Sequence, residues 1–542
     1  MSSRLWHFHG GLHLPGHKAE STSLPITSMP VATQLIVPLQ QHIGAAAHLL
    51  VEVGQKVLKG EPIARPEGVV SAAIHAPSSG TITAIEPHKI PHPSGLPDLC
   101  VFIDTDGEER WCERTPLANA ETADADSLRR HIQASGIVGM GGAGFPSHLK
   151  LNPGEYAVNT LILNGAECEP YITCDDMLMR ERPAQILQGA RLMCRALAAR
   201  QVIIAIEDNK PEALAALRTE AARATTSNIE IIAIPTLYPT GGERQLIKVV
   251  TGQEVPSKGL PVEIGVVCHN VATAAAVYRA VELGEPLVSR IVTVTGEQVP
   301  QPRNLEIAFG TPLQAVLDYC QVEDGTDNSI LMGGPMMGLP LTDSQTPLVK
   351  TSNCLLIRPH EKKPSAQPCI RCGACAGVCP AQLLPQQLYW HARAKAYDRI
   401  QDFHLFDCIE CGCCDAVCPS HIPLVDYYRF AKTEIWAQER EKKVADLARE
   451  RHEFREFRLQ REKEERAARH AQKKKAVSSD DASADEAKKA AIQAAMERAK
   501  AKRNSNAATA KNTDNLTAAQ KQQIEEADQR RARVKENSGD ND

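Results

Sequence analysis

The chain carries one cysteine pattern twice. CIRCGACAGVCP begins at Cys369 and CIECGCCDAVCP begins at Cys408, and both follow the spacing C-x2-C-x2-C-x3-C-P. Three thiolates separated in this way can bind one side of an iron–sulfur cube, and in bacterial ferredoxins the fourth cysteine of such a run ligates the other cluster. The repeat therefore predicts two [4Fe–4S] clusters whose fourth ligands are exchanged between the runs.

Each predicted cluster takes three thiols from one run and the last thiol of the other. The first set is Cys369, Cys372, Cys375 and Cys418. The second set is Cys408, Cys411, Cys414 and Cys379. Structural zinc is the alternative, but zinc sites usually pair two separated C-x2-C knuckles. Cys413 is interpreted as a bystander, and residues 380–407 are expected to form a connecting helix or two.

A glycine-rich loop is the second candidate for chemistry. Clusters move single electrons, so a two-electron donor requires a flavin or an equivalent upstream. SGIVGMGGAGFPSHLKL, residues 135–151, would let backbone N–H groups approach a phosphate, with Lys150 as a counter-charge. A plain hinge is the alternative for such a loop taken alone. The next apolar run ends in Asn164, Glu167 and Glu169, where a parallel sheet exposes its ligands.

The elements around this loop read as a parallel α/β sheet. LILNG, QVIIAIE and IEIIAIP are apolar runs of strand length. The Ala- and Leu-rich segments between them, about residues 183–199 and 211–224, begin at proline, a suitable first-turn residue of a helix. Buried strands separated by helices indicate a Rossmann-like domain.

Two smaller modules flank this domain. Residues 45–86 alternate short β-rich runs with glycine turns and resemble the barrel-sandwich fold of biotinyl and lipoyl domains. No lysine lies between Lys59 and Lys89, so a structural or docking role is expected rather than a swinging arm. In residues 286–345, two strands and a helix opened by Thr311-Pro312 indicate a β-grasp module.

Composition narrows the class of protein. A length of 542 residues suggests three or four domains, and a net charge of −5 gives no case for a nucleic-acid partner. No secretory signal and no membrane-spanning run is expected. The chain holds 17 cysteines, of which ten lie from Cys354 to Cys418, a clustering that favours metal binding in a reducing cytosol.

The last part of the chain has a different composition. It contains no proline after Pro423 and no Phe, Trp or Tyr after Phe457, and charged blocks such as REKEERAARHAQKKK dominate it. Such a stretch can form a solvated helix but cannot bury a core. We expect a flexible, helical, charged tail, with partner binding as the alternative.

These observations predict a multidomain α/β protein with five parts. They are a barrel-sandwich module at 1–120, an α/β domain at 121–285, a β-grasp module at 286–350, a two-cluster ferredoxin domain at 360–430 and the tail at 431–542.

Four segments in order resemble the flavin-carrying, NADH-binding subunit of respiratory complex I. The glycine loop resembles GRGGAGFPxGxKW, and NGAECEP resembles NADExEP. YPTGGERQLIKVVTG (238–252) and VCHNVATAAAV (267–277) resemble the later GEExxLL and NNVET segments. This sequence differs in having Met140 in place of arginine, a single acid at Glu243, and no aromatic residue in VPSKGLP.

The resemblance implies that the α/β domain at 121–285 is of the FMN/NADH type, with two groups of cofactor-binding residues and no catalytic acid or base. The FMN phosphate and ribityl chain would be held by Gly139, Gly141, Gly142, Gly144 and Lys150. The flavin or nicotinamide would be lined by Asn164, Glu167, Glu243, His269, Asn270 and Thr273. A scaffold that has lost its flavin is the alternative.

The full order of segments, with an initial GGLHLPGHK, resembles the C subunit of the Rnf/Rsx ion-translocating electron-transport complex over residues 1–435. The resemblance implies a peripheral protein on the cytoplasmic face of the bacterial inner membrane, docked on integral and other subunits of that complex. It would pass electrons between NADH, FMN and ferredoxin-like carriers in an ion-translocating NADH:ferredoxin-type oxidoreductase. The alternatives are a flavin-free electron wire and docking subunit, or a soluble flavin–iron–sulfur NADH dehydrogenase or hydrogenase subunit.

Overall fold

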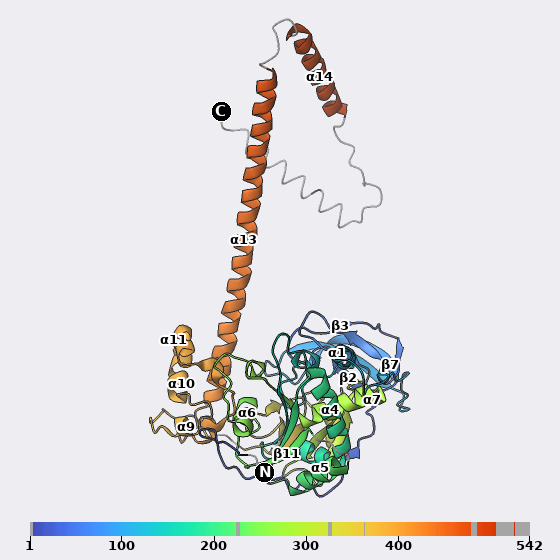
Figure 1. Ribbon diagram of the computed structural model, residues 1–542, viewed down its shortest axis with the longest axis vertical. Helices are drawn as coiled ribbons and strands as arrows, with labels where there is room; N and C mark the ends of the chain where they lie inside the picture. Colours follow the sequence, from blue (N-terminus) through green and yellow to red (C-terminus); the bar gives the residue numbers. More distant parts are fainter. Residues whose placement is uncertain are drawn as a thin grey trace. The chain divides into compact units, whose positions relative to one another are not determined.

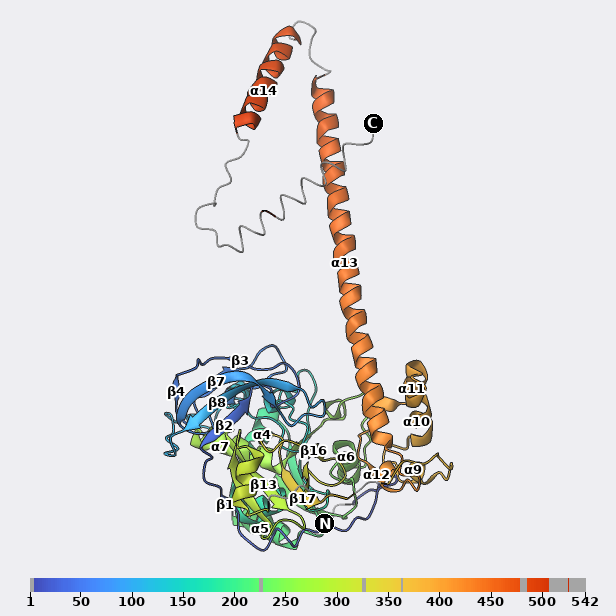
Figure 2. The same ribbon diagram turned by 180° about the vertical axis from the view of Figure 1, so that it is seen from behind.

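The computed structural model describes residues 4–223, 228–323, 328–361, 364–477, 485–505 and 525. The chain divides into two compact units, Met1–Gln438 and Glu439–Asp542. The first unit contains four β-sheets and the short helices that follow them (Figures 1 and 2). Within the described residues, no helix combines the length and the apolar character that crossing a membrane requires.

Two antiparallel sheets form the barrel-sandwich module. One has the strand order β2-β8-β7-β4 and the other the order β3-β5-β6. The strands are β2 (Gln34–Pro38), β3 (His48–Leu49), β4 (Lys56–Val57), β5 (Pro62–Arg65), β6 (Ile74–His75), β7 (Gly80–Lys89) and β8 (Pro97–Thr105). Alternate side chains such as Leu35, Val37 and Ile103 point into one shared core, as expected for half-buried strands.

The predicted parallel sheet is present, with the order β11-β10-β9-β12 and all pairs parallel. Its strands are β9 (Thr160–Gly165), β10 (Gln201–Glu207), β11 (Ile229–Ile234) and β12 (Val266–Asn270). The helices of this domain are α1 (Ala125–Ala134), α2 (Ser147–Lys150), α3 (Cys174–Glu181), α4 (Pro183–Leu197), α5 (Pro211–Arg223), α6 (Glu243–Thr251), η1 (Pro261–Ile264) and α7 (Val271–Leu283). The carboxyl ends of β9 and β12 carry Asn164 and Asn270 in the same register position.

Helices α4 and α7 pack closely against one face of this sheet. Gly189 of α4 makes the approach possible, because a Cβ atom there would lie 1.8 Å from the carbonyl oxygen of Ala274 in α7. The shared core of this layer includes Leu161, Leu163 and Val277. The contact holds α7, and therefore its first turn, at a fixed position over the sheet.

A six-stranded sheet follows, with the order β1-β14-β13-β17-β15-β16. Its elements are β1 (Thr27–Ser28), β13 (Ser289–Thr295), β14 (Arg303–Ala308), β15 (Asn328–Met332), β16 (Leu339–Leu341), β17 (Cys354–Pro359) and α8 (Leu313–Tyr319). The two strands and the helix expected here are present. The sheet is larger than the segment 286–350, because β1 and β17 join it from outside that range.

The two cysteine runs lie among short helices. These are α9 (Ala374–Gly377), α10 (Pro385–Arg393), α11 (Tyr397–Asp402), η2 (Leu405–Asp407), α12 (Cys413–Ala416) and the start of α13 (Leu424–Val477). Helices α10 and α11 are the connecting helices expected between the runs. Tyr428, Ala431 and Ile435 of α13 belong to the same core as Leu388 and Ile400, so this core extends past residue 430.

Within the described residues, the second unit contains the later part of α13 and α14 (Asp485–Ser505). Every described side chain from Glu439 to Lys475 is exposed. A helix that buries no face is stabilised mainly by its own backbone hydrogen bonds and by ion pairs between successive turns, such as Arg461 with Glu465.

Candidate functional site

Two cavities in the ferredoxin-type segment are lined by thiols. One cavity includes Cys369, Cys372, Cys375 and Cys418 in its lining. The other includes Cys379, Cys408, Cys411 and Cys414. The four cysteines predicted for each cluster line the same cavity, and the ligand sets themselves stay a prediction from the spacing. Cys413 also lines the second cavity.

A one-turn helix in each run explains the exchange of the fourth thiol. Gly373 and Gly412, with φ of 80° and 76°, make the turn that leads into α9 and α12. The third cysteine of each run lies in the helix, and the fourth follows its end. At about 1.5 Å per residue, four residues carry the last thiol about 6 Å along the helix axis. Because α9 contacts α12, each displaced thiol reaches the neighbouring cavity.

The chemistry of these cavities fits a cationic cluster. Burial raises the pKa of Cys408 to about 12 and also raises the pKa of Cys414 and Cys379. Protein groups alone therefore leave these thiols neutral, and their deprotonation requires metal ions close to the sulfur atoms. The first cavity lies nearer solvent, since Cys372 is exposed.

The glycine loop between α1 and α2 presents a run of open backbone amides. Gly139 donates its N–H to the Phe145 carbonyl at 2.8 Å, and Met140 donates to Thr273 Oγ1 at 3.0 Å. Among the described residues, no hydrogen bond is donated by the amides from Gly141 to Gly144. The first three of these residues are exposed, and a Cβ atom at Gly142 would meet nothing within 4 Å. Such a loop fits a phosphate group.

The first turn of α7 completes this wall of the site. Asn270 caps α7 by accepting the Ala272 N–H at 2.7 Å, and it donates to Asp175 at 2.6 Å. Burial lowers the pKa of His269 well below its ordinary value, so the imidazole is neutral. His269 Nε2 is buried and makes no hydrogen bond within the described structure.

Lys150 and Glu243 lie on facing elements at the edge of the loop. Lys150 Nζ donates to Glu243 Oε1 at 2.5 Å, and their side chains are 31% and 40% exposed. Asn164 Nδ2 donates to the Gly241 carbonyl at 2.8 Å, which ties the end of β9 to the turn before α6. Lys150, which is predicted to bind the phosphate, therefore forms an ion pair with Glu243, which is predicted to line the flavin or nicotinamide.

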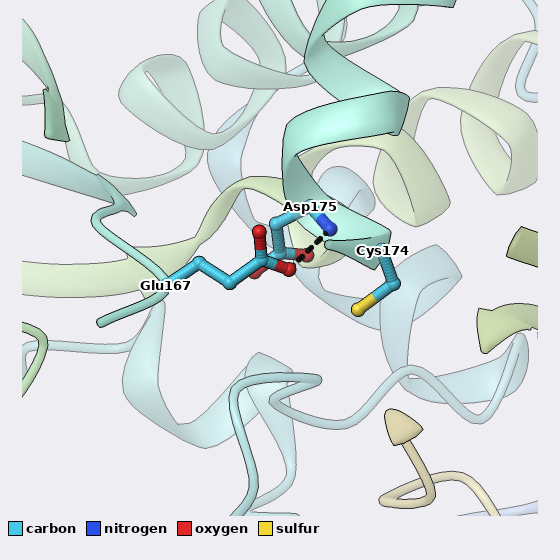
Figure 3. A group of neighbouring side chains, drawn as sticks. All are labelled: Glu167, Cys174 and Asp175. Carbon is cyan, nitrogen blue, oxygen red and sulfur yellow. Dashed lines mark hydrogen bonds between the residues drawn. The ribbon is translucent and has the colours of Figure 1, made fainter. Parts of the chain in front are cut away.

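Glu167 has a structural partner that the sequence does not reveal. Figure 3 shows its carboxylate at the start of α3, where it accepts the N–H group of Asp175 at 2.7 Å. The same carboxylate accepts the N–H group of Asp176 at 3.2 Å. Ligand atoms of Glu167, Cys174 and Asp175 lie within 4.8 Å of one another. Burial raises the pKa of Glu167 to about 8. The carboxyl group thus caps a helix inside the protein and does not face open solvent.

The flavin-type domain and the second thiol cavity are in direct contact. Tyr238, in the turn before α6, donates its hydroxyl to the Cys411 carbonyl at 2.6 Å. Ser257 donates to Asp407 at 2.5 Å. Leu12 packs with Tyr238 and Cys411 in one small apolar cluster. Sequence reasoning missed Tyr238 because no local pattern relates it to a residue so distant in the chain.

Comparisons with known families agree with this arrangement. One family model, the "RnfC Barrel sandwich hybrid domain", matches residues 6–108. The "Nuo51 FMN-binding domain" matches residues 132–279, and the "4Fe-4S dicluster domain" matches residues 368–422. These matches define a protein that combines a domain of the FMN-binding type with a segment of the 4Fe-4S dicluster type.

Curated relatives identify the family of the chain. The C subunit of the ion-translocating oxidoreductase complex of Pseudomonas aeruginosa is 52% identical over 86% of this chain and 60% of the relative. The C subunits from Erwinia tasmaniensis and Pectobacterium atrosepticum are 46% and 47% identical, over 97% and 93% of this chain and 65% and 72% of the relatives. The chain belongs to this family of C subunits.

The chain spans only 60% and 65% of the length of the first two of these relatives. Among solved structures, a NAD⁺-reducing [NiFe]-hydrogenase in the H2-reduced state aligns with a TM-score of 0.42 and 22% identity, over 60% of this chain and 63% of that chain. That similarity is too weak to carry an argument about function.

Proposed function

We propose that this chain is the peripheral electron-input subunit of a membrane-bound, ion-translocating oxidoreductase complex. It would pass electrons between NADH and low-potential acceptors through FMN and two [4Fe–4S] clusters. The observation that carries the proposal is the contact between the two sites: the turn that closes the flavin-type domain holds the loop of the second thiol cavity through Tyr238 and Cys411.

The protein groups that would hold FMN are mostly backbone amides. The open N–H groups from Gly141 to Gly144 would bind the phosphate, with Lys150 and Glu243 at the rim. When bound, FMN would supply the conversion between a two-electron hydride donor such as NADH and one-electron acceptors such as iron–sulfur clusters. Asn270 and Thr273 would hold the loop in position through the contacts of α7.

The two clusters would have different neighbours. The set Cys379, Cys408, Cys411 and Cys414 lies against the flavin-type domain. The set with Cys369, Cys372, Cys375 and Cys418 includes the exposed thiol of Cys372 and lies farther from the flavin-type domain. We assign the first of these as the cluster next to the flavin, and the second as the point of exchange with partners.

The partners would be the integral and other subunits of the complex, together with NADH and ferredoxin-like carriers. The location proposed is the cytoplasmic face of the bacterial inner membrane. The relatives are named as subunits of an ion-translocating complex, which supports this assignment.

A flavin-free electron wire is the second candidate. The pairing of Lys150 with Glu243 favours it, because this pair neutralises the lysine at the mouth of the loop. In that case the α/β domain would serve only to bind partners.

Anaerobic purification of the full chain separates the two candidates. We expect one flavin released on denaturation, iron for two clusters, and reduction of the clusters by NADH seen by EPR. Two clusters without FMN, even after reconstitution, would leave the wire. Tightly bound zinc without iron would exclude both.

A further inference from the structure

The segment that includes GGLHLPGHK lies outside the barrel-sandwich sheets. Residues 4–21, here called the N-terminal strap, contain no helix and form only one isolated bridge, Leu12 with Tyr238. The strap crosses from the flavin-type domain to the cysteine runs. Neither the proposed cofactor contacts nor the sandwich fold accounts for it.

The middle of the strap is hydrogen-bonded to the first cysteine run. Gly11 donates its N–H to the Val378 carbonyl at 3.0 Å, and His9 Nδ1 lies 3.1 Å from the Cys379 carbonyl oxygen. Gly10, with φ of +71°, lies so close that a Cβ atom there would be 2.5 Å from the Val378 carbonyl carbon. A side chain at this position would separate the strap from the run.

The same residues bind the flavin-type domain. Leu12 and Tyr238 exchange two backbone hydrogen bonds, of 2.7 and 2.9 Å. Tyr238 in turn donates its hydroxyl to the Cys411 carbonyl. Farther back, Trp6 donates its N–H to the Val249 carbonyl at 3.0 Å in α6. The strap is therefore bonded on one side to the cysteine runs and on the other to the turn before α6.

The end of the strap enters the acidic turn after β9. Lys18 Nζ donates to the carbonyl oxygens of Glu167, Glu169 and Ile172 at 2.6, 2.8 and 2.6 Å. Tyr171 donates its N–H to the Gly16 carbonyl at 2.8 Å, and its ring stacks on His17 at 4.4 Å. Three converging carbonyl groups can compensate the cost of placing an ammonium in the interior.

This turn needs an external support. Glu167 and Tyr171 both have positive φ, 50° and 70°, a conformation that is strained for a residue other than glycine. Burial lowers the pKa of Lys18, and the Glu167 carboxyl opposes that shift. The three hydrogen bonds donated by Lys18 thus stabilise a strained turn that directly follows β9.

We propose that the N-terminal strap holds the proposed flavin site and the adjacent cluster at a fixed separation, with Gly10 and Lys18 as its positioning residues. The proposal rests on the function proposed above. It gives GGLHLPGHK a role in transfer between the two redox sites, since the strap contacts both without contributing a cluster ligand.

Gly10→Ala in the full chain tests the strap at the cysteine run. Flavin content, iron content and NADH oxidation with ferricyanide should stay unchanged, because these measure each site separately. The rate of NADH-driven cluster reduction in stopped flow should fall several-fold, because electron transfer between two redox centres slows as their separation increases.

Two matched variants control for glycine replacement itself. At Gly16, also in the strap, a Cβ atom would meet only the Lys18 side chain at 3.5 Å. At Gly54, φ is +89° but nothing lies within 4 Å, so Gly54→Ala carries the backbone penalty without the clash. Both Gly16→Ala and Gly54→Ala should reduce their clusters at the wild-type rate.

Lys18→Met tests the other end of the strap. It should raise the KM for NADH through the loosened turn at Glu167, whereas Gly10→Ala should leave this KM unchanged. Equal cluster reduction in Gly10→Ala and wild type overturns the strap proposal. A wild-type chain without flavin or iron overturns the proposed function instead, so the two failures are distinct.

Discussion

Replacement of Cys418 should damage the cluster built on the first run, although Cys418 belongs to the second run. The structure places this thiol in the cavity of Cys369, Cys372 and Cys375. The thiol of Cys414, four residues earlier, lines the other cavity. A helical rise of about 6 Å over four residues separates the two thiols along the chain.

The size of the expected iron loss follows from the number of iron atoms in each cluster. Two [4Fe–4S] clusters contain about eight iron atoms per chain, so loss of one cluster leaves about four. Cys418→Ser and Cys369→Ser should each lower the iron content to about four. Because both changes affect one cluster, the double variant should also retain about four, a fully non-additive result.

The contrasting pair is Cys418→Ser with Cys408→Ser. These thiols line different cavities, so the double variant should retain close to no iron. Iron analysis and low-temperature EPR of anaerobically reconstituted full chain give the measurement. Cys413→Ser is the matched control, since the spacing assigns this thiol no ligand role, and it should keep about eight iron atoms.

The reverse pattern would refute the exchange of ligands. If the variant with Cys408 and Cys418 replaced keeps about four iron atoms and the variant with Cys369 and Cys418 replaced keeps almost none, each run holds its own cluster. The cavity linings would then not describe the ligand sets. Circular dichroism of each variant excludes unfolding as the cause of iron loss.

Three further changes test other parts of the structure. Tyr238→Phe leaves the buried Cys411 carbonyl without its 2.6 Å hydrogen bond, and denaturant unfolding should show a loss of about 1–2 kcal/mol together with a shifted potential of the adjacent cluster. Gly189→Ala should lower the free energy of unfolding by about 1–3 kcal/mol or more, since its Cβ would lie 1.8 Å from a carbonyl oxygen of α7; Gly16→Ala should have little effect. Burial lowers the pKa of Lys350 from 10.5 to about 7. The wild-type free energy of unfolding should therefore decrease as pH falls from 10.5 to 7, and Lys350→Met should remove this dependence. An identical pH profile in both proteins would contradict this assignment.

Lys350 also shows how the modules are joined. Its amine is fully buried and donates to the carbonyl oxygens of Ala73 and Gly136 at 2.8 and 2.6 Å. One side chain thus contacts the barrel-sandwich module and the flavin-type domain from the segment between β16 and β17. Neutral amines have two N–H donors, and both are used here.

Local patterns were sufficient for several features. The apolar runs after residue 160 predicted β9, β10 and β11, and proline at the first turn located α4 and α5 within one or two residues. These features depend on neighbours in the sequence, since a buried strand or a helix start needs only a few consecutive residues of the right type. The glycine loop was recognised for the same reason.

Contacts between distant segments were not predictable in this way. The pairing of Lys150 with Glu243, the cap that Glu167 provides for α3 and the bond from Tyr238 to Cys411 depend on how the elements pack. β1 and β17 likewise joined the six-stranded sheet from outside the expected segment.

The amino-acid sequence by itself predicted which thiols could share a cluster, because three of the thiols lie a few residues apart and the spacing assigns the fourth to the other run. It did not determine which cluster meets the flavin-type domain. His9 and Cys379 are 370 residues apart in the chain and touch only because the strap folds back between two domains. Such a contact depends on complementary surfaces formed by many side chains, so only the tertiary structure decided it.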